Sequence, residues 1–348
     1  MNSMEMENKE KNFDLLALGE LLLRLSPPSN ERLTRGDTFV KQAGGAEFNV
    51  ASGVSLLGLH TGVLSKLPAN DMGTYIKNRI RFNGVSDDYL VYDEEKDARL
   101  GVYYYENGAY PRKPRIVYDR MHTSFQRISP EDFPDSMYAN TRCFHTSGIT
   151  LALGPGPRKT AVTMIRKFKE QGALISFDVN FRGNLWTGEE ARACIEQLLP
   201  YVDIFFCSED TARLTFHKEG TQQEIMKSFT REYPISIVAS TKRTVHSPKV
   251  HTFQSMIYNA KDDCFYTEEP YHNIEVVDRI GSGDAYVSGV LYGLLSEPDD
   301  LQRALEYGDA ASAVKNTIPG DLPASDKREL DTIRREHKQT GAQSEMDR

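Results

Sequence analysis

Four consecutive residues, Gly281-Ser282-Gly283-Asp284, carry the clearest chemical signal in the chain. A helix is predicted directly after them, because apolar residues recur at helical spacing from Val287 to Leu294. Small residues at a helix start leave backbone N–H groups free to bind an anion such as a phosphate. Asp284 could then accept the proton of a hydroxyl that attacks a phosphoryl group. The alternative interpretation is a turn in which Asp284 only caps the helix.

A second group, Gly44, Gly45 and Asn49, stands at the start of another predicted helix. The two glycines allow close approach of a ligand to the backbone, and an amide side chain can bridge two hydroxyls. A turn followed by helix packing would explain the glycines but would not explain Asn49. The group is therefore a candidate site for a hydroxyl-rich ligand.

Charged and amide side chains follow several predicted strands. Asp178 and Asn180 end the predicted strand Leu174 to Val179, at the edge where open α/β sheets bind ligands. Arg120 and Arg182 each carry a planar guanidinium, which can hold a carboxylate through two parallel hydrogen bonds. A lone arginine is more often part of a surface ion pair, so the pair of arginines matters more than either one.

Alternating strands and helices must position these residues. Buried strands are predicted at Phe13 to Gly19, Arg142 to His145, Leu174 to Val179, Ile204 to Cys207 and Ile235 to Ala239. Helices are predicted around Val50 to Leu57, Val162 to Phe168, Ala191 to Leu199 and Ala285 to Leu295. This order predicts an α/β fold with a mostly parallel sheet covered by helices. Two stretches, Leu21 to Gln42 and Arg99 to Thr123, break the rhythm and indicate a small β-sheet lid.

Composition narrows the class of protein. The chain has 348 residues and a formal net charge of −8, which argues against a general binder of nucleic acids or anionic membranes. No stretch approaches the roughly 18 apolar residues of a membrane-spanning helix, and no signal-type segment follows the N-terminus, so a cytoplasmic location is expected. The four cysteines show no metal-ligand spacing. The charged ends, residues 1–12 and 326–348, are predicted to be solvated tails, the second with the alternative of a frayed helix.

Two segments resemble family signatures. Asp278 to Tyr286 resembles the C-terminal signature of the ribokinase-like (PfkB) carbohydrate kinases, and Gly44 to Ala51 resembles their N-terminal glycine signature. Within that family the sequence is most similar to 2-keto-3-deoxygluconate kinases at four segments, namely Asp278 to Gly281, Tyr118 to Arg120, Asp178 to Arg182 and Thr317 to Asp321. The similarity runs from about Phe13 to about Leu322, nearly the whole chain apart from the tails.

The resemblance implies a fold and an activity. It implies a ribokinase-like three-layer sandwich over residues 13–325, with a lid that often serves as a dimer clasp. It also implies phosphorylation of a sugar hydroxyl by ATP with Mg²⁺, with Asp284 as the base and Gly281, Ser282 and Gly283 as the anion hole. The residues that it assigns to the sugar are Gly44, Gly45, Asn49, Tyr103, Tyr118, Arg120 and Arg182. From their place at the sheet edge, Asp178 and Asn180 are expected to contact the substrate or the phosphate.

The nucleotide side departs from the family pattern. Family members commonly carry Asn-x-x-Glu after the strand that matches Ile204 to Cys207, but this chain has Ser208-Glu209-Asp210-Thr211. Glu209 is the candidate for a metal-associated carboxylate, and Asp210 is the alternative. By resemblance, Thr241, Lys242 and Arg243 contact the nucleotide and Asn316 lies near the adenine. A solvated basic turn is the alternative for the residues at 241–243.

The leading hypothesis is an ATP-dependent kinase that phosphorylates 2-keto-3-deoxygluconate at its terminal hydroxyl, giving the 6-phosphate. Its expected partners are an acid sugar and ATP, with no nucleic acid or membrane. One alternative is a kinase for a neutral ketose such as fructose. The other is a binding protein for a sugar or nucleotide that kept the fold and lost catalysis. An exposed lid sheet would leave edge strands unprotected, so a homodimer through the lid is also expected.

Overall fold

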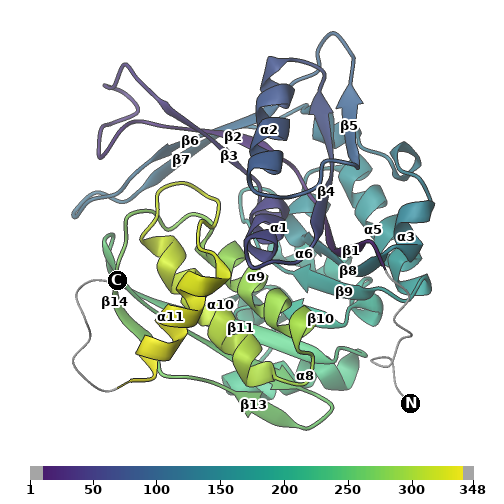
Figure 1. The fold of residues 1–348 in the computed structure, drawn as a ribbon, viewed down its shortest axis with the longest axis vertical. Coiled ribbons are helices and arrows are strands. Elements are labelled where there is room, and N and C mark those ends of the chain that lie inside the picture. The colour runs from purple at the N-terminus through teal and green to yellow at the C-terminus, as the bar shows by residue number, and fades with distance from the viewer. Residues whose placement is uncertain (1–10, 340–348) are drawn as a thin grey trace.

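A large sheet organises the molecule in this computed structural model, which describes residues 11–339 (Figure 1). Its strands are β1 (Phe13–Leu18), β4 (Thr61–Pro68), β5 (Leu90–Asp93), β8 (Thr141–Ser147), β9 (Leu174–Asp178), β10 (Ile204–Phe206), β11 (Ile237–Ser247), β12 (Val250–Asn259), β13 (Cys264–Tyr266) and β14 (Tyr271–Glu275). They run in the order β13-β12-β11-β10-β9-β8-β1-β4-β5, and β14 pairs with β12. Neighbours from β11 to β5 are parallel, whereas β12 pairs antiparallel with β11, β13 and β14.

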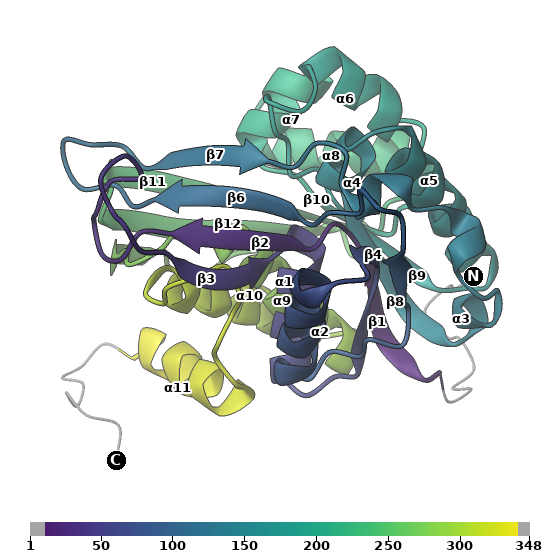
Figure 2. The same cartoon turned by 90° about the horizontal axis from the view of Figure 1, so that it is seen from above.

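Helices cover both faces of this sheet. They are α1 (Ala46–Leu56), α2 (Asp71–Phe82), α3 (Ser136–Ala139), α4 (Gly148–Ala152), α5 (Pro155–Glu170), α6 (Gly188–Ile195), α7 (Glu209–Phe216), α8 (Gln222–Glu232), α9 (Ser282–Ser296), α10 (Leu301–Asn316) and α11 (Lys327–His337). Side chains alternate along a strand, so Leu15 and Leu16 of β1 enter different cores. Leu16 packs in the core of α3 to α8, and Leu15 packs with α1, α9 and α10 (Figure 2). The three-layer sandwich that the resemblance implies is confirmed.

A second, four-stranded sheet stands apart from the large one (Figures 1 and 2). Its strands are β3 (Val40–Gly44), β2 (Leu22–Ser26), β6 (Gly101–Glu106) and β7 (Arg115–Asp119), in that order. The pair β2–β6 is parallel, and β2–β3 and β6–β7 are antiparallel. The two stretches that interrupt the strand–helix rhythm thus supply all four of these strands. We call this sheet the lid.

Two elements near the site extend beyond their predicted ranges. The strand predicted to end at Ala239 continues to Ser247, because β11 pairs with β12 along its whole length as a long hairpin. The helix predicted from Ala285 begins at Ser282, so α9 includes most of the Gly-Ser-Gly-Asp segment in its first turn. Both extensions bring polar residues toward the site described below.

The charged ends of the chain lie partly within the described residues. Residues 327–337 form α11, which buries Leu330 and docks on α10 through an ion pair of 2.7 Å between Arg334 and Glu306. This part of the predicted solvated tail is therefore a packed helix, because Leu330 and Arg334 lie one turn apart and further contacts join α11 to the body, among them the stacked rings of His337 and Tyr271. Residues 1–10 and 340–348 of the predicted tails lie outside the described residues. Among residues 11–339, no helix is long and apolar enough to cross a membrane.

Candidate active site

Two adjoining cavities lie where the carboxyl end of β9 meets the lid and the start of α9. The first, about 510 Å³, lies under the lid and is lined by Tyr103, Tyr118 and Asp284 among others; we call it the lid cavity. The second, about 470 Å³, follows β11 and is called the β11 cavity. Six residues line both cavities and form what we call the junction: Asp178, Asn180, Arg182, Arg243, Ser282 and Gly283. A group bound at the junction would be within reach of ligands in both cavities.

The loop before α9 has the shape of an anion cradle. Gly281 precedes the helix with a φ of +80°, and a Cβ there would lie 1.9 Å from the carbonyl oxygen of Asp321, so only glycine fits. Gly283 has open space around its Cα, with nothing within 4 Å of an added Cβ. Its N–H belongs to the first turn of the helix, where amides have no acceptor within the helix. The cradle is open toward the junction.

Asp284 is held by Asn49 rather than used as a helix cap. The Asn49 amide Nδ2 donates to Asp284 Oδ2 over 2.7 Å, and the cap position of α9 shows no side-chain hydrogen bond. Burial raises the pKa of Asp284 to about 6, although the Asn49 hydrogen bond and the Arg182 charge oppose the shift. Asn49 Oδ1 is buried without a partner in the described structure, so this amide keeps one acceptor for a ligand.

Asp178 is a second carboxyl at the same place. Its Oδ1 accepts from the backbone N–H of Asn180 over 3.0 Å. Burial, and after it the charge of Asp284, raises the pKa of Asp178 to about 7. Two carboxyls with raised pKa values that face one ligand site are typical of proton-transfer chemistry.

The predicted sugar residues divide into those that line the lid cavity and one that does not. Gly45, Asn49, Tyr103, Tyr118, Arg120, Arg182, Asp178 and Asn180 all line it. Gly44 lies outside it, at the end of β3, where an added Cβ would lie 2.2 Å from Asp321 Oδ2. The glycine is thus explained by packing against Asp321, which sequence reasoning did not assign to the site.

The two arginines predicted to bind a carboxylate have different surroundings. Arg120 donates from Nε and Nη2 to Glu20 Oε2, over 2.9 and 2.5 Å, and both side chains are buried. Arg182 donates only to the backbone carbonyl of Phe181, and it forms no ion pair with any residue between 11 and 339. Arg182 is therefore the freer of the two cations for an anionic ligand.

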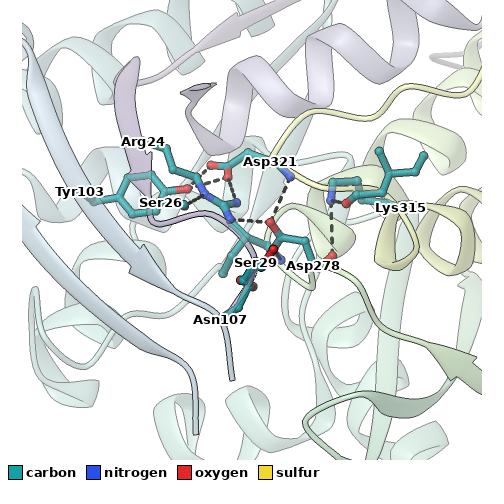
Figure 3. Close-up of polar contacts among 11 residues, drawn as sticks. Arg24, Ser26, Ser29, Tyr103, Asn107, Asp278, Lys315 and Asp321 are labelled. Atoms are coloured by element: carbon teal, nitrogen blue, oxygen red, sulfur yellow. Dashed lines mark hydrogen bonds and ion pairs between the residues drawn. The ribbon is translucent and has the colours of Figure 1, made fainter. Parts of the chain in front are cut away.

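A buried network below the lid cavity ties the lid to the cradle (Figure 3). Arg24 on β2 is 2% exposed and donates from Nη2 to Asp278 over 2.5 Å and from Nη1 to Asp321 over 2.8 Å. Tyr103 on β6 donates its hydroxyl to Asp321 over 2.6 Å, so this hydroxyl is already engaged. The Asp278 carboxylate in turn accepts hydrogen bonds from the backbone N–H groups of Ile280 and Gly320. Arg24 thereby connects the lid, the loop before α9 and the turn after α10.

Sequence reasoning did not assign five charged residues of this region to the site. Glu20, Glu47 and Asp321 line the lid cavity, and Arg24 and Asp278 form the network with Asp321. Three of the five, Glu47, Asp278 and Asp321, lie inside segments that resemble the family. Glu47 accepts from Ser147 Oγ and Thr150 Oγ1 over 2.6 and 2.8 Å. Burial raises the pKa of Glu47. The available signal for Glu47 was its place in a helix-start motif, two residues before Asn49, where a buried glutamate is unusual.

The β11 cavity contains most of the predicted nucleotide residues. Thr241, Lys242 and Arg243 line it, as do Glu209 and Asp210. Asn316 does not: it is 2% exposed and donates from Nδ2 to the Ser312 carbonyl within α10. The structure therefore does not bring Asn316 to either cavity.

The candidate metal carboxylate has a competing partner. Glu209 Oε1 pairs with Arg213 over 2.6 Å, one helical turn along α7. Within residues 11–339 no group of three or more His, Cys, Asp or Glu side chains could hold a metal ion by itself. Mg²⁺ in phosphate sites usually takes one or two carboxylates and keeps several waters, so the carboxylates of Asp210 and Glu209 fit that role.

An α/β sandwich with a buried carboxylate base, an open helix start and two joined cavities at the sheet edge defines a phosphotransferase for hydroxyl groups. Residues 12–327 match the family described as "pfkB family carbohydrate kinase". The chain belongs to this family of sugar kinases. It is therefore a phosphotransferase with an alcohol group as acceptor.

Individual relatives are similar to this chain over nearly its whole length. The chain is 32% identical over 323 residues to 2-dehydro-3-deoxygalactonokinase of Haloferax volcanii, covering 92% of this chain and 96% of that protein. The crystal structure of 2-dehydro-3-deoxygluconokinase of Thermotoga maritima is similar, with a TM-score of 0.87, 32% identity, and coverage of 92% of this chain and 99% of that one. A structure from E. coli solved with ATP and Mg²⁺ shares the fold at a TM-score of 0.79 and 19% identity, covering 93% of this chain and 100% of that one.

Proposed function

We propose that this sugar kinase transfers the γ-phosphoryl group of ATP to the terminal hydroxyl of a 2-keto-3-deoxy acid sugar, with 2-keto-3-deoxygluconate as the leading candidate. The observation that carries the proposal is Arg182, which lines the lid cavity together with Asp284 and forms no ion pair within residues 11–339. A neutral sugar would leave this charge without a partner. The two relatives at 32% identity bear the names of kinases for 2-dehydro-3-deoxy acid sugars, which supports the same class.

The residues have distinct tasks in this reaction. Asp284 removes the proton of the sugar hydroxyl, and Asn49 holds the carboxylate in place for it. The N–H groups at the start of α9 stabilise negative charge on the phosphoryl oxygens. Closure of the lid over the sugar excludes water and so limits hydrolysis of ATP.

ATP and Mg²⁺ are the cofactors of the proposal. The β11 cavity, with Thr241 and Lys242 on its wall, would take the nucleotide. Asp210 and Glu209 would hold Mg²⁺ through water, and the ion would neutralise charge on the phosphates when bound. The E. coli structure of the same fold was solved with both ligands, which supports this assignment. The cytoplasm is the proposed location, since it supplies ATP.

Substitution of Arg182 tests the acid-sugar assignment. Arg182→Ala should raise KM for 2-keto-3-deoxygluconate about 10- to 100-fold, the cost of losing charge-assisted hydrogen bonds, and leave KM for ATP within about threefold. Steady-state kinetics with each substrate varied in turn measures both constants. Arg182 is a cleaner probe than Arg120, because Arg120→Ala would also strand the buried Glu20 carboxylate. An unchanged KM for the acid sugar would favour a neutral ketose such as fructose.

The lid is also the proposed contact between two subunits. Val40 on β3 and Val117 on β7 are 47% and 54% exposed, on the two outer strands of the lid. Outer strands with exposed apolar side chains are open to pairing with another chain. We expect a homodimer, and light scattering at micromolar concentration tests it. The mass of a monomer would contradict the expectation.

A further inference from the structure

Two arginines of the junction, Arg182 and Arg243, and a third beside it, Arg279, lie close to one ligand site. Arg182 and Arg243 line both cavities, and Arg279, in the loop before α9, lines the lid cavity beside Gly281. None of the three forms an ion pair with any residue of the described range, 11–339. In contrast, Arg24 on β2 and Arg120, which directly follows β7, both form ion pairs with carboxylates. The junction and its border therefore hold three positive charges that no ion pair within residues 11–339 neutralises.

The electrostatics agree with this arrangement. Arg243 is exposed by accessible surface, yet desolvation by the surrounding protein, and after it the charges of Arg279 and Arg182, lowers its pKa. Asp178 and Asp284 compensate only part of this charge: the charge of Arg182 lowers the pKa of each carboxyl, but neither forms an ion pair with the three arginines within residues 11–339. Like charges held close together repel, and an anion placed between them would relieve the repulsion. The anion that must pass this point in a kinase reaction is the phosphoryl group.

The position of Arg243 follows from strand geometry. Thr241, Arg243 and Val245 alternate along β11 and all line the β11 cavity. The strand is fixed by its pairing with β12, where Arg243 lies opposite Phe253. An arginine on a paired strand is held more firmly than one on a loop. Arg279 approaches from a different element, one residue after Asp278, which the network of Arg24 fixes.

We propose that Arg243 and Arg279 bind the phosphoryl group while it moves from ATP to the sugar, and that Arg182 remains with the sugar carboxylate. This inference rests on the proposed reaction at the same site. The bond between the phosphorus and the oxygen bridging to the β-phosphate breaks, and a bond between phosphorus and the sugar oxygen forms. The hydroxyl proton passes to Asp284, and ADP leaves with the bonding electron pair. Charge spreads over three phosphoryl oxygens in the transition state, where guanidinium groups bind more tightly than in the ground state.

The test compares Arg243→Met and Arg243→Lys with Arg328→Met. Arg328 is an exposed arginine on α11 that lines neither cavity, so it controls for the loss of one positive charge. Arg243→Met should lower kcat about 10²- to 10³-fold, as removal of a single transition-state donor does, with ADP affinity within about threefold of wild type. Arg328→Met should keep the wild-type kcat, and added guanidinium ion should restore part of the rate to Arg243→Met without changing the rate of Arg328→Met. A kcat within threefold of wild type would overturn the inference.

A second measurement separates this inference from the proposed function. Wild-type protein with ADP, Mg²⁺, aluminium fluoride and 2-keto-3-deoxygluconate should form a tight complex that mimics the planar phosphoryl group, and Arg243→Met should weaken it at least tenfold. Calorimetry measures the affinity without turnover. Equal affinity in the two proteins would overturn the role of Arg243 even if the kinase is active. Absence of phosphorylated sugar in the wild-type reaction would contradict the proposed function, and the aluminium fluoride affinities would still decide the inference.

Discussion

Asp284→Asn should lower kcat about 10³-fold while ATP binds with nearly unchanged affinity. The substitution keeps the size of the side chain but removes the group that takes the proton from the sugar hydroxyl, and general-base catalysis contributes about 10²- to 10⁴-fold. The loop amides and the cavity walls do not change, so ground-state binding should persist. Single-turnover kinetics and ATP titration measure the two quantities separately. A kcat within about tenfold of wild type would contradict the role of Asp284.

The dependence of the reaction rate on pH tests the role of Asp284 as the base independently. Burial raises the pKa of Asp284 to about 6, so a growing share of the base is protonated and inactive as the pH falls through this value. The wild-type rate should therefore fall below about pH 6 and level off above it. The residual rate of Asp284→Asn should lack this inflection. An inflection that survives in Asp284→Asn would assign it to another group, with Asp178 as the first candidate.

Arg24→Met should lower the free energy of unfolding by about 3–5 kcal/mol. The methionine fills much of the space but leaves the carboxylates of Asp278 and Asp321 buried without their cation, and breaking a buried ion pair from one side has this cost. The effect should also reach catalysis, because the same carboxylates position the loop before α9. Urea denaturation followed by circular dichroism measures the loss.

Two further variants show whether the lost stability comes from stranded charge. Arg81→Met removes an ion pair with Asp87 in which the Arg81 side chain is 61% exposed, so it should cost less than about 1 kcal/mol. Adding Asp278→Asn and Asp321→Asn to Arg24→Met removes the stranded charges and should recover part of the stability. A loss below about 1 kcal/mol for Arg24→Met alone would mean that the network does not stabilise the fold.

Local sequence patterns predicted most of the strands and helices, because the spacing of apolar residues within each element indicates its type. The alternation of buried strands and amphipathic helices indicated the parallel sheet, and β1, β8, β9 and β10 all lie where apolar runs occur. The lid was found by its departure from that rhythm. The end of β11 was not predicted, since its exposed outer half, from Lys242 onward, is ordered by pairing with β12 and carries no apolar run of its own.

The site was predictable only where its residues sit in short motifs. Asp284, Gly283 and Asn49 lie in such motifs, and the structure brings all three together. The partner of Arg120 is Glu20, 100 residues earlier, and Arg24 meets Asp321 across 297 residues. No spacing in one sequence reveals such pairs, so Arg120 looked free and Arg24 went unnoticed. Asn316 was placed by resemblance alone, and its side chain points back to α10.

The most direct test of the account is ADP release with Mg²⁺ and ATP across a matched set: 2-keto-3-deoxygluconate, 2-keto-gluconate, fructose, ribose and no sugar. The account predicts ADP release with the carboxylated sugars and only background without sugar. Release with fructose instead would keep Asp284 as the base but contradict the role of Arg182. Tight binding of a sugar with no ADP release in any reaction would contradict the account as a whole.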